Sequence, residues 1–102
     1  MKTTLTLITT FSILSFVSGQ TFTNYTIDSG LVNNDVLCLD VAGSDVMWFG
    51  TQEGISVFNG TTWIAHTTAT DTNLAHNTIQ ALCVLSDGNV WIGTDFGASY
   101  YN

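Results

Sequence analysis

The amino-acid sequence predicts an all-β fold of consecutive antiparallel sheets, and three observations support this prediction. Residues 28–59 align with residues 71–102 at a constant offset of 43 positions and without a gap. In each copy, short apolar segments alternate with Gly, Asn and Asp turn residues, which is the pattern of antiparallel strands. A repeat of this length is typical of arrays whose units bury their apolar faces against one another.

The two copies share many residues at equivalent positions. Eleven of the 32 aligned positions are identical: Asp28/Asp71, Leu31/Leu74, Asn34/Asn77, Leu39/Leu82, Val41/Val84, Trp48/Trp91, Gly50/Gly93, Thr51/Thr94, Gly54/Gly97, Ser56/Ser99 and Asn59/Asn102.

Turn residues divide the first copy into four strands. Gly43 interrupts an apolar run, and Gly54 closes a short loop that requires a positive φ, which glycine adopts without steric cost. Asn59-Gly60 is a strong hairpin signal. We therefore expect strands at residues 36–41, 46–51, 55–58 and 62–66.

The second copy repeats this plan, with strands expected at residues 79–85, 90–94 and 98–101. Asn102 aligns with Asn59, which precedes the fourth strand of the first copy, and residues 22–26 resemble that fourth strand. This is the arrangement of a ring closed by shared strands. The expected organisation of residues 20–102 is a closing strand at 20–27, a first repeat at 28–70 and an incomplete second repeat at 71–102.

The first 19 residues have the features of a secretory signal peptide. Lys2 supplies a positive charge, residues 5–17 form an apolar run, and Ser18 and Gly19 are small residues at the cleavage position. The run is too short and too rich in hydroxyl groups to span a membrane. We expect cleavage after Gly19 and export to the periplasm or the cell exterior, with no transmembrane segment in the rest of the chain.

The charge distribution excludes several partners. Lys2 is the only Lys or Arg in the chain, against eight Asp and Glu residues. Without cations, residues 20–102 cannot neutralise phosphates, so nucleic acid is not an expected partner. Arginine or lysine clamps on phosphorylated or carboxylated ligands are excluded for the same reason.

Two copies of one motif carry a family resemblance. Trp48-Phe49-Gly50-Thr51-x-x-Gly54 and Trp91-Ile92-Gly93-Thr94-x-x-Gly97, each preceded by Leu-x-x-Asn and an apolar strand, resemble the two-component-regulator propeller repeat. This resemblance implies about two four-stranded antiparallel blades of a larger β-propeller ring. It also implies a sensor region of a bacterial exported protein, often placed before a membrane-spanning histidine kinase.

The repeated motif residues are expected to pack blade against blade. A large indole fills the gap between neighbouring sheets, so we expect Trp48 and Trp91 in the core. A sugar-stacking role for an indole is the alternative. Gly50 and Gly93 are expected to allow close approach of the backbone.

The residues able to carry chemistry are few. Cys38 and Cys83 are expected to be buried thiols on the same face of equivalent strands, and since stacked blades turn opposite faces to each other the two sulfurs should not meet; a disulfide is the alternative. His66, in an edge strand, and His76, in a loop, are expected to be mostly solvated, because no zinc-site spacing surrounds them. We expect no metal, no cofactor and no enzymatic activity.

A ligand is expected at the end of the molecule where polar loops gather. In a four-stranded meander, the loop between the second and third strands and the crossover to the next blade emerge at one end. Amides and carboxylates there, without cations, would suit neutral carbohydrates, and polar loops on a rigid scaffold commonly bind ligands. These residues are Asn33, Asn34, Asp35, Gln52, Glu53, His76, Asn77, Asp95 and Phe96.

Two functions remain open from the sequence. In the first, the chain is the N-terminal part of a longer exported propeller, acting as a ligand-sensing or interaction scaffold before a signalling or surface-attachment module. Its partners would then be further blades of the same longer chain. In the second, it is a short lectin that builds one ring from several copies of itself, with residues 22–26 completing a neighbour.

Overall fold

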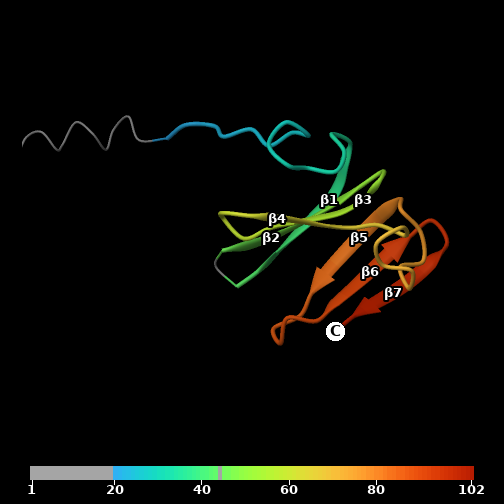
Figure 1. Cartoon of the computed structure of the whole chain (residues 1–102). Helices are drawn as coiled ribbons and strands as arrows, with labels where there is room; N and C mark the ends of the chain where they lie inside the picture. Colours follow the sequence, from blue (N-terminus) through green and yellow to red (C-terminus); the bar gives the residue numbers. More distant parts are fainter. Residues whose placement is uncertain (1–19, 44) are drawn as a thin grey trace, which may run out of the picture.

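The computed structural model describes residues 20–43 and 45–102, so the expected signal peptide at 1–19 lies outside the described residues. The described part folds into two antiparallel sheets with strand orders β1-β2-β3-β4 and β5-β6-β7 (Figure 1). We call them sheet 1 and sheet 2. The strands are β1 (Val36–Ala42), β2 (Val46–Thr51), β3 (Gly54–Phe58), β4 (Trp63–His66), β5 (Ile79–Val84), β6 (Val90–Thr94) and β7 (Gly97–Tyr101).

The repeated turns confirm the interpretation of the sequence. Gly54 has a φ of 122° and Gly97 has a φ of 98°, values that favour glycine. The Thr51 hydroxyl donates to the carbonyl of Gly54 at 2.8 Å and accepts from the Glu53 N–H at 3.0 Å. Thr94 makes the equivalent bonds in sheet 2, at 2.7 Å and 3.1 Å. The Thr-x-x-Gly motif therefore closes the same hairpin twice.

The two sheets are built alike beyond their turns. Each first strand carries a register irregularity at the same place, between Val36 and Cys38 and between Ile79 and Ala81. The repeated serines also act alike: Ser56 Oγ accepts from the Val32 N–H and Ser99 Oγ accepts from the Ala75 N–H, both at 2.9 Å. These bonds hold the segment before each sheet against its third strand.

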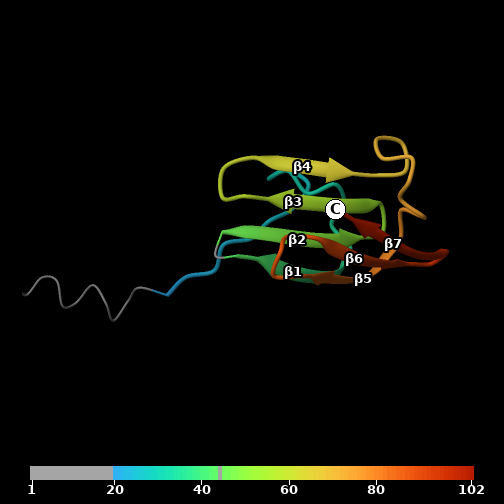
Figure 2. The ribbon, with the colours of Figure 1, turned by 90° about the horizontal axis from the view of Figure 1, so that it is seen from below.

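The sheets pack face to face, with β5 of sheet 2 against β1 and β2 of sheet 1 (Figures 1 and 2). The core between them contains Trp48, Ile55, Leu74, Ile79, Val90 and Ile92. A Cβ added at Gly50 would lie 2.6 Å from Cγ2 of Ile79, closer than carbon atoms can approach. Gly50 therefore forms a notch that Ile79 fills, as expected for close approach of the backbone.

Each sheet consequently has an inner face, which contacts the other sheet, and an outer face. The inner face of sheet 1 carries Trp48, and the inner face of sheet 2 carries Val90 and Ile92. Trp91 lies on the outer face of sheet 2 and is 52% exposed, whereas Trp48 is 6% exposed. The prediction of a core position was correct for Trp48 and wrong for Trp91, because no sheet in the described structure covers the face on which Trp91 lies.

The cysteines follow the same division. Both are free thiols; Cys38 is partly buried between the sheets and Cys83 is exposed on the outer face of sheet 2. The prediction that they would not pair is confirmed. The prediction of two buried thiols is wrong for Cys83, which shares the uncovered face of Trp91.

The segment at residues 20–27 is not paired into either sheet. Its Tyr25 ring lies on the outer face of sheet 1, with its centroid 5.5 Å from that of Phe58 and 5.8 Å from that of Trp63. The segment thus covers part of an apolar face without forming a strand.

Candidate functional site

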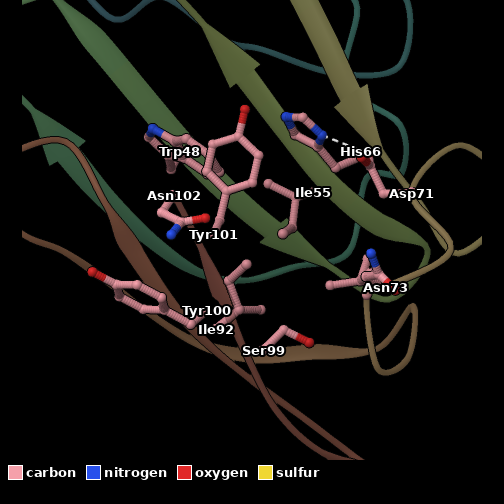
Figure 3. A pocket seen from close by; sticks show the side chains of 11 residues that line it. Trp48, Ile55, His66, Asp71, Asn73, Ile92, Ser99, Tyr100, Tyr101 and Asn102 are labelled. Carbon is pink, nitrogen blue, oxygen red and sulfur yellow. Dashed lines mark hydrogen bonds and ion pairs between the residues drawn. The ribbon is translucent and has the colours of Figure 1, made fainter.

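A cleft opens between the two sheets along the side where β4 and β7 lie (Figure 3). Its volume is about 200 Å³, which is below the usual range of about 300 to 1,000 Å³ for drug-sized ligands. It therefore suits one small unit such as a single ring. The lining residues are Trp48, Ile55, His66, Asp71, Asn73, Leu74, Ile92, Ser99, Tyr100, Tyr101 and Asn102.

An imidazole and a carboxylate meet at this cleft. His66 is the last residue of β4, and Asp71 follows after a turn in which the Asp71 N–H donates to the carbonyl of Thr67 at 2.7 Å. Nδ1 of His66 lies 2.7 Å from Oδ2 of Asp71. The expectation of a solvated His66 was wrong, since its side chain is 17% exposed. Sheet 2 covers this edge and the Asp71 carboxylate compensates for the burial.

Aromatic rings form one wall of the cleft. The His66 ring stacks on Trp48 with an interplanar angle of 5° and a centroid distance of 5.8 Å. Tyr101 of β7 meets both rings, at 5.5 Å from Trp48 and 5.2 Å from His66. Figure 3 shows the three rings together, with the dashed hydrogen bond leading from His66 to Asp71. The wall is therefore assembled from both sheets.

The remaining lining groups offer hydrogen bonds without positive charge, apart from His66 when protonated. Asn73 comes from the crossover, and Ser99 and Asn102 come from β7 and the residue after it. Ser99 Oγ already accepts the Ala75 N–H, so its hydroxyl proton is free to be donated elsewhere. Amides, a hydroxyl and a carboxylate beside aromatic rings can recognise hydroxyl groups and apolar ring faces together.

The polar loop residues predicted from the sequence lie elsewhere. None of the nine lines this cleft, and several support local turns. Asn34 Oδ1 accepts the Ile27 N–H at 2.9 Å and Asn77 Oδ1 accepts the Thr68 N–H at 2.8 Å. Asn33 Oδ1 caps the Asp35 N–H at 2.7 Å. These amides therefore fix the crossovers before each sheet.

The other predicted loop residues come together only in pairs. His76 Nδ1 accepts the Thr78 N–H at 3.0 Å, and its ring lies 4.9 Å from that of Phe96. Asp95 Oδ1 accepts from the Gln80 amide at 2.8 Å. Gln52 and Glu53 are exposed on the β2–β3 turn. The loop end thus presents separate small groups.

Sequence reasoning missed the cleft because its residues come from separate parts of the chain. Trp48 and Tyr101 are 53 positions apart in the numbering, and they meet only because the sheets pack face to face. One signal was available: Ser99 and Tyr101 are two residues apart in one expected strand, which places both on the same face of their sheet.

Among residues 20–43 and 45–102 there is no group of three or more His, Cys, Asp or Glu side chains that could hold a metal ion. Within the described residues, the His66 ring forms a hydrogen bond with the Asp71 carboxylate. The described residues form strands and turns, and they include no helix that could cross a bilayer.

Comparison with known proteins agrees with the fold. Residues 73–96 match the model of the family described as two component regulator propeller. This stretch contains β5, β6 and the second copy of the motif from Trp91 to Phe96, without its final Gly97, so the resemblance predicted from the sequence is confirmed there. The two antiparallel sheets are β-propeller blades, with four strands in the first and three in the second. A search of the curated proteins returned no relative.

Proposed function

We propose that this chain is an exported β-propeller scaffold that binds an uncharged, hydroxyl-rich ligand, such as a sugar unit of a glycan, in the cleft between its blades. The observation that carries the proposal is the meeting of Trp48, His66 and Tyr101 beside the Asp71 carboxylate. Aromatic faces pack against the apolar face of a sugar ring, while amides donate and accept hydrogen bonds to its hydroxyls and carboxylates accept them.

The electrostatics support a neutral ligand. The formal net charge of the chain is −7, and Lys2 is its only Lys or Arg. An anionic ligand would meet Asp71 with no cation other than His66 in the cleft. In this proposal the scaffold recognises its ligand without changing it chemically, and a signalling or surface-attachment module carries the response.

Binding of neutral oligosaccharides to the purified chain tests the proposal, with tryptophan fluorescence and calorimetry as readouts. We expect saturable binding that protects Trp48 from acrylamide quenching. Tyr101→Ser and Asp71→Asn should each weaken binding about tenfold or more, because each removes a contact worth about 1.4 kcal/mol. Phe22→Ser, at a ring that is 98% exposed and lies outside the cleft and the polar loops, is the matched control and should bind as the parent chain does.

Two results would contradict this assignment. The first is the absence of binding across a panel of neutral glycans. The second is binding that Tyr101→Ser leaves unchanged while substitutions at Asn33 or Gln52 abolish it, since this would place the ligand at the polar loops instead.

A second candidate is a lectin in which several chains build one ring. One observation favours it. The ring centroid of Tyr25 lies 5.5 Å from that of Phe58, and the ring centroid of His66 lies 5.2 Å from that of Tyr101, the residue aligned with Phe58. The segment at residues 20–27 therefore takes the place that a fourth strand takes on the other sheet. The same ligand chemistry would apply to this assembly.

A further inference from the structure

The outer face of sheet 2 is an exposed copy of the face that sheet 1 buries. Trp91 and Gly93 occupy the positions of Trp48 and Gly50 in the repeat. A Cβ built on Gly50 would collide with Cys38 of its own sheet and with Ile79 of the other sheet, whereas one built on Gly93 meets only atoms of Ala81 in its own sheet, at an ordinary 3.5 Å or more. Sheet 2 therefore carries the notch and the indole of a blade interface, and no other described sheet covers them.

The same chain also displays a surface of the kind that fills such a notch. Ile79, Leu82 and Val84 of sheet 2 pack against sheet 1. Their aligned residues Val36, Leu39 and Val41 are 37%, 55% and 45% exposed on the outer face of sheet 1. The outer face of sheet 2 is thus equivalent to the inner face of sheet 1, and the outer face of sheet 1 is equivalent to the inner face of sheet 2.

A hollow on the outer face of sheet 1 completes this match. It has a volume of about 450 Å³ and is lined by Tyr25, Asp45, Met47, Phe49, Phe58 and Gly60. Three of these residues align with Val90, Ile92 and Tyr101, which face Trp48 across the inner interface. If an indole packed on this face of sheet 1 as Trp48 packs on sheet 2, it would enter the hollow. There it would contact Tyr25, as Trp48 contacts His66.

We infer that this chain associates head to tail with a second copy of itself, the outer face of sheet 2 docking on the outer face of sheet 1 of the next copy. Val36 of the second copy enters the notch at Gly93, and Trp91 enters the hollow beside Tyr25. Such a contact joins two different surfaces, so repetition yields a closed ring or a filament. The inference deepens the second candidate function, a ring built from several chains, and does not depend on the ligand proposed for the cleft.

Three of the positions at which the new interface differs from the inner one lie on the outer face of sheet 2. Cys83, Ala98 and Tyr100 stand where sheet 1 has Asp40, Ile55 and Val57. Asp40 Oδ2 accepts the Val84 N–H across the inner interface at 2.8 Å, and the Cys83 thiol is a weaker acceptor at that place. Ala98 is smaller than Ile55 and Tyr100 is larger than Val57, so side-chain volume lost at one position of the face is regained at the other.

Sedimentation velocity on the purified chain, over about 1 to 100 μM, which spans weak association, tests the inference. A reducing agent keeps Cys83 from forming disulfides between copies. We expect a discrete oligomer whose population rises with concentration. Gly93→Val should shift the chain to monomer, because the new side chain fills the notch, while its circular dichroism stays unchanged and its melting temperature equals that of the parent chain at dilutions where the parent is monomeric. Phe96→Glu, an exposed change outside both faces, should associate as the parent chain does.

A mixing experiment separates the head-to-tail contact from any other association. Leu39→Glu places a charge on the opposite face and should also yield monomers, because burying an unpaired charge is costly. An equimolar mixture of Gly93→Val and Leu39→Glu retains one intact notch and one intact apolar face, so it should form a 1:1 complex and nothing larger. A parent chain that is monomeric at 100 μM, a Gly93→Val variant that associates normally, or a mixture without the 1:1 complex would each overturn the inference.

Discussion

At the scale of single residues, the environment of a side chain depends on whether another sheet lies opposite. Trp48 and Trp91 occupy the same position in the repeat, yet one is buried and the other is half exposed. Gly50 and Gly93 differ in the same way, because one is filled by Ile79 and the other is open. Residue type therefore predicted which positions can pack against another sheet, but it predicted burial correctly for Trp48 and incorrectly for Trp91.

The two thiols should differ in reactivity for this reason. Burial raises the pKa of the Cys38 thiol, and a backbone hydrogen bond from Gly50 offsets part of this effect. A raised pKa leaves less of the reactive thiolate at a given pH, and Cys38 is also shielded by sheet 2. With a small maleimide near pH 8, Cys83 should react at least about tenfold faster than Cys38.

Mass spectrometry of peptides from a timed labelling reaction measures both rates in one sample. Addition of denaturant should bring the two rates together, because unfolding removes the burial of Cys38. Equal rates in the folded chain would show that the sheets do not shield this thiol.

At the scale of elements, the repeated Thr-x-x-Gly hairpin has the same geometry but unequal burial in the two sheets. Thr51 is fully buried, with an exposure of 0%, whereas Thr94 is only partly buried. Both hydroxyls make two hydrogen bonds to their own turn. Removing a buried hydroxyl leaves its partners unsatisfied, while water can replace an exposed one.

Thr51→Val should therefore lower the free energy of unfolding by about 1 to 3 kcal/mol. Thr94→Val, which removes the same bonds at the more accessible turn, should cost less than about 1 kcal/mol. Urea unfolding followed by far-ultraviolet circular dichroism compares the two variants with the parent chain. A larger loss for Thr94→Val would contradict the importance of burial here.

Strand positions were predictable because turn chemistry is local. Gly54, Asn59-Gly60 and Gly97 mark hairpins by requirements of their own backbone, and the strands on either side of these turns end and begin within about three residues of them. The segment at residues 20–27 shows the limit of this reasoning. A strand needs a partner, and none of the described strands pairs with this segment.

At the scale of the whole molecule, the contact between sheets includes one charged group whose state depends on pH. Hydrogen bonds from the Val84 and Val41 N–H groups hold the pKa of Asp40 below its usual range. The Val84 bond crosses from sheet 2 to sheet 1. A carboxylate whose pKa is depressed on folding stabilises the fold above its unfolded pKa, and this stability is lost as pH falls through the folded value.

The melting temperature should therefore decrease as pH is lowered below about 4, the usual pKa of Asp. Asp40→Ala should melt at a lower temperature than the parent chain at neutral pH and show a smaller decrease on acidification. Calorimetry from pH 2 to 7 covers the range in which the carboxylate titrates. If both proteins lose stability equally on acidification, the cross-sheet bond does not account for the effect.

The candidate site was not predictable from the sequence for a reason that belongs to this same scale. The cleft depends on how sheet 2 is placed over sheet 1, which brings Tyr101 to His66 and Trp48. Periodicity shows which residues share a face, but it does not show which parts of two faces stay apart. The polar loops attracted the prediction because their residue types suit ligands, although several of those amides cap turns.

The unpaired segment at residues 20–27 has a consequence for proteolysis. Its residues are mostly exposed and have no strand partner, and such segments are readily cleaved. A protease that trims the chain beyond Tyr25 would remove the ring that shields Phe49 and Phe58. Amino-terminal trimming would then expose more apolar surface to water and leave both blades folded. The solubility of a sample would therefore depend on how much of its amino-terminal segment has been removed.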